Sequence, residues 1–248
     1  MKVFTETMVR DMIKSSRVPV FQVPEGKILS PAAKEYLQQQ KVEISYQKDD
    51  TSAERKAVPT GYTDYETGMS YGTKPEHMTQ LTGNLLVPKN HPRIIFRGKL
   101  DTLEATVVLT QIQLEAVQGP KELIADLSDF MRVLREMMKC DVLDEPFKND
   151  RIIGLTHAQL RERSHDPLKF YGVKQMIPPD YSLGAVHALL NRLRTAVRET
   201  ETAAVGAFLQ DAHVMRKDIL EELNRLSSAV HIMMCRYLGG GYGVDKEE

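Results

Sequence analysis

The chain has 248 residues, 42% of them hydrophobic, which is enough for one sizeable domain and a small additional unit. Its 33 Lys and Arg residues nearly balance its 34 Asp and Glu residues, and the net charge of -1 argues against a nucleic-acid-binding protein. The two cysteines, Cys140 and Cys235, stand apart without a CxxC pattern, which excludes a disulfide framework and a sulfur-rich zinc site.

Residues 1–46 have the pattern of a small α/β unit. FTETMVRDMIKS is helical, PVFQV is extended, LSPAAKEYLQQQ opens with Ser30 and Pro31 as helix cap and first helical residue, and VEISY alternates. The N-terminus carries charges every few residues, and no window approaches the roughly 18 apolar residues of a membrane span. We therefore expect no signal peptide and no membrane association, and a cytoplasmic location.

Residues 47–77 form a polar segment rich in Gly, Thr and Tyr that has no hydrophobic period. Such a composition is typical of a flexible linker. We therefore expect the domain boundary here and the second domain at residues 78–248.

Helical periodicity dominates the second domain. Together with a helix near residues 98–118, three apolar seams predict a mainly α fold, an antiparallel bundle of four or five helices broken by the proline-containing stretch SHDPLKFYGVKQMIPPDYS. Residues of the seams recur every three or four positions, if one polar step at Glu201 is skipped: Leu123, Leu127, Phe130, Leu134 and Met137; Val186, Leu190, Leu193, Val197, Ala204 and Phe208; Ile219, Leu223, Leu226, Val230 and Met234.

One of these helices carries a polar stripe directly beside its apolar seam. The stripe follows steps of three and four residues and consists of His187, Asn191, Arg194, Arg198 and Glu201. A solvated face, with Arg198 paired locally to a glutamate, is the simplest interpretation. Asn224 lies beside the seam of the last helix in the same way. If the two helices face each other, their amide and guanidinium groups form a pocket suited to a phosphate chain.

Residues 78–105 hold a third group of polar positions. Thr82, Gly83 and Asn84 predict a turn whose backbone N–H groups suit an anion, and a helix begins near Asp101. Lys89 and Arg93 add positive charge in between. No GxxxxGK[ST] or GxGxxG pattern occurs in the sequence, which excludes a Walker loop and a Rossmann fingerprint.

These three groups, in this order, resemble the ATP:corrinoid adenosyltransferases, and in particular their ethanolamine-utilization branch. The family's phosphate-binding segment, its Arg-Thr-x-x-Arg-x-x-Glu motif and its Leu-Asn-Arg-Leu-Ser motif are all matched. The matching residues are Thr82, Gly83, Lys89, Arg93, Gly98 and Asp101; Arg194, Thr195, Arg198 and Glu201; and residues 223–227. The likeness to the ethanolamine branch extends to DEPF, IIGL, HDPLKF and LSPAAKEYL, so it covers most of the chain.

The sequence departs from the family at two places. Many relatives carry a histidine and a Cys-Cys-x-x-Cys cluster that binds a divalent metal, whereas residues 60–80 here hold His77 and no cysteine, so we expect no structural transition metal. A more distant branch covers the cobalt with an aromatic-Ile-Leu-Pro loop, but the matching stretch here reads QMIPP. Phe170, Tyr171 and Met176 are therefore the candidates for the corrinoid pocket.

The resemblance implies transfer of the 5′-deoxyadenosyl group from ATP to cob(I)alamin, giving adenosylcobalamin for ethanolamine ammonia-lyase and releasing the polyphosphate. Because cob(I)alamin is itself the nucleophile, no catalytic Ser, Cys or Lys is needed. Thr82, Gly83, Lys89, Arg93, Arg198 and Glu201 would bind the triphosphate with Mg²⁺, and Asn224 would orient the nucleotide. Arg194 would pair with Asp101, as happens across a subunit boundary in the related branch. The segments KFYGVKQMIP and VHIMMCRYL offer the corrinoid an apolar lining, although Met-rich stripes more often belong to a core.

The resemblance also implies partners. We expect a homo-oligomer, a trimer as in the related branch or else a dimer, together with a partner reductase and association with a bacterial microcompartment. The alternative is a non-catalytic helical protein that docks into an ethanolamine microcompartment through residues 1–46. The presence of Lys89, Asp101, Arg194, Arg198 and Asn224 argues against that alternative.

Overall fold

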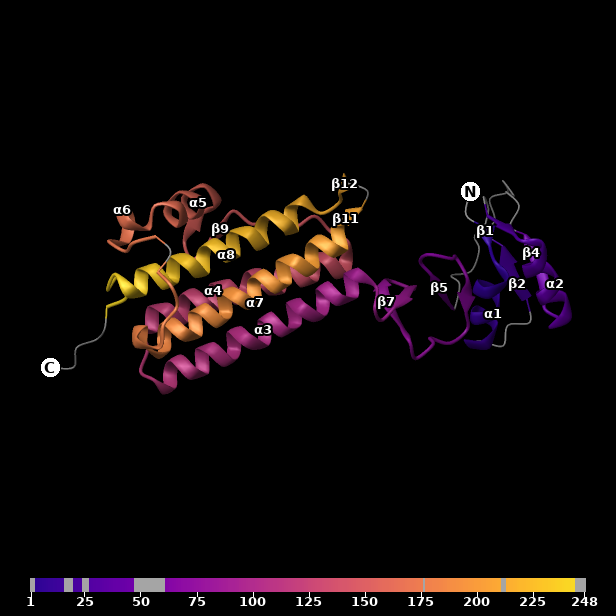
Figure 1. Cartoon of the computed structure of the whole chain (residues 1–248), viewed down its shortest axis with the longest axis horizontal. Helices are drawn as coiled ribbons and strands as arrows, with labels where there is room; N and C mark the ends of the chain where they lie inside the picture. Colours follow the sequence, from indigo (N-terminus) through magenta and orange to yellow (C-terminus); the bar gives the residue numbers. More distant parts are fainter. Residues whose placement is uncertain are drawn as a thin grey trace. The chain divides into compact units, whose positions relative to one another are not determined.

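The structure, a computed structural model, describes residues 3–15, 20–23, 27–46, 61–175, 177–210 and 213–243. Contacts divide the chain into two compact units, residues 1–91 and residues 92–248. Helices dominate, as the sequence predicts (Figure 1). None of the described helices is both long enough and apolar enough to span a membrane.

The first unit combines short strands with two helices. Its N-terminal elements are β1 (Val3–Phe4), α1 (Glu6–Ser15), β2 (Val20–Val23), β3 (Ile28–Leu29), α2 (Pro31–Gln39) and β4 (Glu43–Tyr46). Strand β1 pairs in parallel with β3, and β2 with β4. Ser30 caps α2 as predicted, since its Oγ accepts a hydrogen bond from the Ala33 N–H at 3.1 Å.

A four-stranded sheet completes the first unit. It has the order β6-β5-β8-β7 and consists of β5 (Tyr62–Asp64), β6 (Ser70–Tyr71), β7 (Met78–Thr82) and β8 (Leu85–Pro88). Strands therefore occupy part of residues 61–77, where the sequence led us to expect a linker, whereas residues 47–60 lie outside the described residues. The Asp64 carboxylate accepts hydrogen bonds from the backbone of Glu66 and Thr67, which stabilises the turn between β5 and β6.

One hydrophobic cluster joins the N-terminal elements to this sheet. It contains Phe4, Val9, Phe21, Val23, Leu29, Ala33 and Leu37 from the N-terminal elements, and Met69, Tyr71, Met78 and Leu86 from residues 61–91. A hydrogen bond of 2.7 Å from Lys27 Nζ to the Glu66 carbonyl links the two parts as well. The β7–β8 hairpin therefore depends on residues 1–46 for its core.

We expect deletion of residues 1–46 to unfold the sheet of residues 62–88, because its buried side chains would be exposed to water. Leu37→Ala, at a fully buried position, should destabilise the first unit by about 2–5 kcal/mol, whereas Ile28→Ala, at an exposed position, should cost far less. Hydrogen exchange of residues 62–88 measures both effects. Full protection of these residues in the deletion variant would show that the N-terminal elements fold separately.

The second unit is the predicted helical bundle. Within the described residues, four long helices run side by side: α3 (Pro92–Ala116), α4 (Lys121–Leu143), α7 (Gly184–Phe208) and α8 (Lys217–Leu238) (Figure 1). Between α4 and α7 lie β9 (Arg151–Ile152), β10 (Leu155–Thr156), α5 (His157–His165), α6 (Pro167–Tyr171) and the 3₁₀ helix η1 (Tyr181–Leu183). The hairpin of β11 (Leu209–Gln210) and β12 (His213–Val214) joins α7 to α8.

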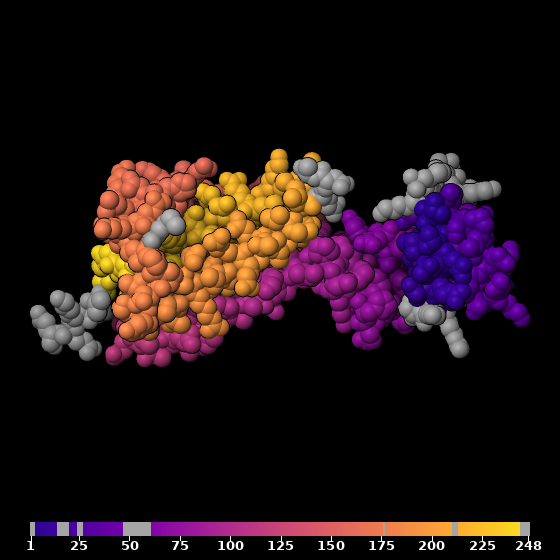
Figure 2. Space-filling model, viewed as in Figure 1, coloured from indigo at the N-terminus to yellow at the C-terminus, as the bar shows by residue number. Residues whose placement is uncertain are grey.

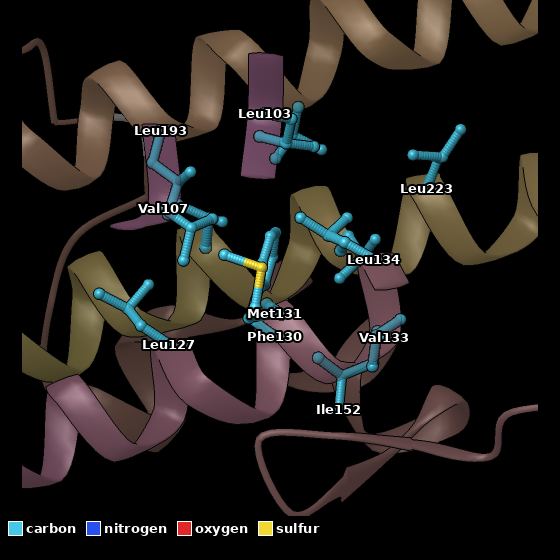
Figure 3. Packing of buried hydrophobic residues seen from close by; sticks show 14 of the residues in the cluster. Leu103, Val107, Leu127, Phe130, Met131, Val133, Leu134, Ile152, Leu193 and Leu223 are labelled. Carbon is cyan, nitrogen blue, oxygen red and sulfur yellow. The ribbon is translucent and has the colours of Figure 1, made fainter. Parts of the chain in front are cut away.

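The core of the bundle confirms the three predicted seams, since all of their residues are buried. Figure 3 shows members of one hydrophobic cluster that come from all four long helices: Leu127 and Leu134 of α4, Leu103 of α3, Leu193 of α7 and Leu223 of α8. Burial of these apolar faces stabilises the bundle. It also places the polar stripe of α7 at the edge of the core.

Candidate functional site

A cavity of 330 Å³ lies between α7, α8 and the segment that follows α6. From α7 it is lined by His187, Asn191 and Arg194; from α8 by His231, Met234, Cys235 and Leu238; and on its third side by Val173, Lys174, Ile177, Pro178 and Pro179. In Figure 2, the yellow surface of α8 is set back between orange α7 and the segment that contains α5 and α6. Three members of the predicted polar stripe therefore face a cavity of the size that holds small ligands.

Arg194 is held in place by Asn191, one turn earlier on α7. Its Nε and Nη2 both donate to Asn191 Oδ1, at 3.2 and 3.0 Å. Burial lowers the pKa of His231 on α8, and the positive charge of Arg194 lowers it further. The His231 imidazole is therefore neutral near neutral pH.

Two further groups in the cavity wall are also uncharged. Cys235 Sγ lies 3.7 Å from His231 Nε2, and burial raises the pKa of this thiol to about 11, which keeps it protonated. His187 is buried, burial lowers its pKa, and its Nδ1 has no hydrogen-bond partner among the described residues. The cavity thus combines an apolar lining and neutral rings with the positive charges of Arg194 and Lys174.

The polar stripe continues beyond the cavity along α7. Arg198 is exposed and Glu201 is half-buried. Helices α7 and α8 run in opposite directions (Figure 1). Along the sequence, Glu201 lies about two turns after Arg194 on α7, and Asn224 lies about two turns before His231 on α8. Asn224 is exposed, and its Oδ1 accepts a hydrogen bond from Arg225 Nη2 at 2.9 Å. The two helices therefore present polar groups from the cavity outward.

Arg93, which the sequence proposes as an ATP ligand, belongs to an ion-pair cluster that joins α3 to α4. Its Nη2 lies 2.9 Å from Asp141 Oδ1, and Arg97 Nε lies 2.6 Å from Asp141 Oδ2. Asp141 is fully buried, and a buried carboxylate requires such partners. Our sequence interpretation missed Asp141, although it lies four residues after Met137 on the seam of α4 and so interrupts an apolar pattern.

Three predicted phosphate ligands belong to the first unit. Thr82 and Gly83 lie at the β7–β8 turn, where Gly83 has a φ of 52° that favours glycine. Gln80 Nε2 donates to the Gly83 carbonyl at 3.1 Å. Lys89 follows β8 and is exposed, so its ammonium group is open to a ligand.

Asp101 lies on the exposed face of α3, at the start of an apolar stripe. The stripe consists of Ala105, Val108, Leu109 and Ile112, all of them exposed, with Ile112 57% accessible. Asp101 forms no ion pair within the described part of a single chain, and Arg194 is engaged with Asn191 there. The predicted Arg194–Asp101 pair is therefore absent from the described residues of one chain.

The aromatic candidates for the corrinoid pocket lie outside the cavity wall. Phe170 contacts two cations, with Lys169 Nζ 4.7 Å and the Arg163 guanidinium 5.4 Å from its ring centre. Tyr171 packs against the bundle core. Met176 lies outside the described residues. The QMIPP stretch nevertheless lines the cavity through Ile177 and the two prolines, so both segments that the sequence offers as an apolar lining contribute to it.

Comparisons with known proteins agree with the motifs. The model of the cobalamin adenosyltransferase family matches residues 69–237. The corrinoid adenosyltransferase EutT of Salmonella typhimurium is 34% identical over 247 residues, 93% of this chain and 90% of the relative. EutT of Escherichia coli is 41% identical over 162 residues, 65% of this chain and 58% of the relative. A solved variant of a PduO-type ATP:corrinoid adenosyltransferase from Lactobacillus reuteri, complexed with cobalamin and ATP, is 22% identical with a TM-score of 0.48, over 66% of this chain and 90% of that one.

Proposed function

This chain belongs to the cobalamin adenosyltransferase family and is an ATP:corrinoid adenosyltransferase, and from that premise we propose that the α7–α8 cavity and the adjoining polar stripe form its active site. The enzyme transfers the 5′-deoxyadenosyl group of ATP to the cobalt of cob(I)alamin. We further propose that the adenosylcobalamin serves an ethanolamine ammonia-lyase, and that the polyphosphate is the leaving group.

One observation carries this assignment: an apolar cavity and a row of guanidinium and amide groups lie on the same two helices. The apolar wall, with Ile177, Met234 and Leu238, suits the corrin ring, and the polar row suits the nucleotide. A half-buried, charge-assisted hydrogen bond to a phosphate oxygen contributes about 1.5–3 kcal/mol.

The protein's contribution to this reaction is to position the two substrates. The nucleophile is the cobalt of cob(I)alamin, which attacks C5′ of ATP; the C5′–O5′ bond breaks, and its electron pair leaves with the polyphosphate. Residues of this chain orient C5′ in line with cobalt and exclude water through the apolar wall. Arg198 on α7 would neutralise the charge on the leaving polyphosphate. The family resemblance assigns phosphate contacts to Lys89 and the Thr82–Gly83 turn of the first unit as well.

Mg²⁺ fits the polar stripe as a companion of the triphosphate. The Glu201 carboxylate forms no ion pair or hydrogen bond within the described residues, so its oxygens are open to a hard cation. Mg²⁺ commonly binds through one or two carboxylates together with substrate phosphates. Bound there, it would supply positive charge to the polyphosphate, while Asn224 orients the nucleotide.

The exposed apolar stripe of α3 supports a homo-oligomer. Ala105, Val108, Leu109 and Ile112 form a face that a second copy of the chain would bury. Asp101 begins this face, so we propose that it pairs there with Arg194 of a neighbouring subunit. A trimer and a dimer both satisfy this contact.

Cob(II)alamin must gain an electron before it attacks ATP, which calls for a partner reductase. Cys140 and Cys235 are both buried free thiols, and burial raises the pKa of each, so neither suits electron delivery. We propose that an external reductase supplies the electron.

We also propose that the enzyme works in or beside an ethanolamine microcompartment. Co-purification with microcompartment shells tests that location.

Removal of transition metals should leave the activity unchanged. Among the described residues, no three His, Cys, Asp or Glu side chains are grouped to hold a metal ion. Treatment with a transition-metal chelator followed by an assay with ATP and Mg²⁺ measures this, and the metal content of the purified protein is its control. Stoichiometric zinc or iron whose removal abolishes turnover would contradict the expectation.

The test of the function is an assay with cob(II)alamin, a chemical reductant, ATP and Mg²⁺. The spectrum of adenosylcobalamin should develop with the purified protein and stay absent when ATP is omitted. A non-catalytic interaction protein would yield no product in either case. That result would favour the microcompartment-docking alternative.

A further inference from the structure

The chain that follows α8 turns back onto α4. Tyr242 is buried and donates its hydroxyl to Asp126 Oδ2 at 2.6 Å. The Arg236 guanidinium lies 4.1 Å from the centre of the Tyr242 ring and contacts Glu122 at 2.6 Å. Burial and the bond to Asp126 raise the pKa of Tyr242, so the hydroxyl stays protonated and continues to donate. Residues 239–242, here called the post-α8 segment, are therefore fixed to the bundle.

Gly239 opens this segment at a point where two backbones touch. Its φ is -78°, a value that any residue adopts, so its own conformation does not require glycine. A Cβ at this position would lie only 2.3 Å from the Tyr171 carbonyl oxygen. The close approach of the neighbouring backbone is thus the reason that only glycine fits.

The contact directly adjoins two stretches that line the cavity, since Tyr171 lies two residues before Val173 and Gly239 directly follows Leu238. Tyr171 ends α6, and Gly172, with a φ of 68°, turns the chain into the wall segment, defined as residues 173–175 and 177–179. That segment supplies Val173, Lys174, Ile177, Pro178 and Pro179 to the cavity. Leu238, directly before Gly239, lines the same cavity from α8. The Gly239–Tyr171 contact therefore joins both walls next to the site.

We propose that the post-α8 segment positions the wall segment over the cavity, and that Gly239 is a positioning residue for corrinoid binding. Tyr242 and Arg236 hold the segment on α4, and Gly239 transmits that position to the end of α6 through direct backbone contact. The proposal rests on the assignment of the cavity to the corrinoid.

Gly239→Ala tests the contact, and Gly243→Ala is its matched control, because a Cβ at Gly243 meets no atom of the described residues within 4 Å. In the Gly239→Ala protein, hydrogen exchange of the wall segment should accelerate and the KM for cob(I)alamin should rise roughly tenfold, with the KM for ATP unchanged. A fold defect would instead move both KM values and the melting temperature. Gly243→Ala should resemble the wild type in every respect.

Tyr242→Phe provides a second variant that leaves Gly239 intact and removes the hydroxyl bonded to Asp126. It should also loosen the wall segment and raise the KM for cob(I)alamin, by less than Gly239→Ala. If hydrogen exchange of the wall segment is as slow in both variants as in the wild type, the post-α8 segment does not position the wall segment, and the proposal is overturned. Faster exchange with an unchanged KM for cob(I)alamin overturns the assignment of the cavity to the corrinoid, and with it the proposed active site.

Discussion

The Arg198→Lys variant should transfer the adenosyl group roughly 100-fold more slowly than the wild type, because lysine lacks the planar fork that holds two phosphate oxygens at once. The structure favours this role over local charge pairing. Glu199 pairs with Lys99 at 3.0 Å, and Arg198 forms no ion pair within the described residues. Its guanidinium is therefore free to bind a phosphate chain.

Arg192→Lys is the matched control for this substitution. Arg192 is also an exposed arginine on α7, but it lies off the polar stripe. Both variants should keep a stability within about 0.5 kcal/mol of the wild type, as melting temperature and circular dichroism would show. Steady-state rates at saturating ATP and cob(I)alamin provide the comparison. Equal rates for Arg198→Lys and the wild type would contradict the phosphate-binding role and would show that the polar stripe is a solvated helix face.

Asp101→Ala and Arg194→Ala should each lower activity by roughly 100-fold or more, because the ion pair proposed for them across the subunit boundary would order the site. Co-expression of the two variants should restore activity. Random assembly rebuilds the wild-type pair at about a quarter of the subunit interfaces, since each interface draws one residue from either copy. Turnover of the purified mixed oligomer, compared with each variant alone, measures the recovery.

If the mixed oligomers stay inactive, Asp101 and Arg194 do not form a pair across the subunit boundary. Either both residues act within one chain, or they do not belong to the site. Size-exclusion chromatography of the same samples shows whether oligomers have formed. Ile112→Asp, on the exposed stripe of α3, provides the companion test of the interface. It should shift the protein toward the monomer, since a charge is costly in a buried apolar contact.

The helical bundle could be predicted from sequence because its apolar seams repeat over long stretches. The seam residues from Leu123 to Met137 recur with helical spacing, and all of them are buried in the structure. The sheet of residues 62–88 gave no comparable signal. Its described strands span two to five residues and are rich in Thr and Tyr, and too few positions alternate to mark a face.

The candidate site was predictable in part, and the reason differs from residue to residue. Asn191 and Arg194 lie on the predicted stripe and line the cavity, because spacing along one helix determines its faces. The pairing of Arg93 with Asp141 depends on how α3 packs against α4, which no local pattern encodes. Ile177 and Pro178 line the cavity because of the path of an irregular segment, and no periodic pattern in the sequence predicts such a path. The sequence therefore suggested the neighbouring aromatic residues Phe170 and Tyr171 as the corrinoid-pocket candidates instead.

The most direct test of the account follows two labels of ATP, one in the adenosine and one in the phosphates, during reaction with cob(I)alamin. Adenosyl transfer breaks the C5′–O5′ bond, so the adenosine label should appear in the corrinoid while all of the phosphate label is released. Phosphate label in the corrinoid product would show that a different bond of ATP is broken. Release of phosphate without any adenosine label in the corrinoid would show hydrolysis alone, and either result would contradict the assignment of this chain as an adenosyltransferase.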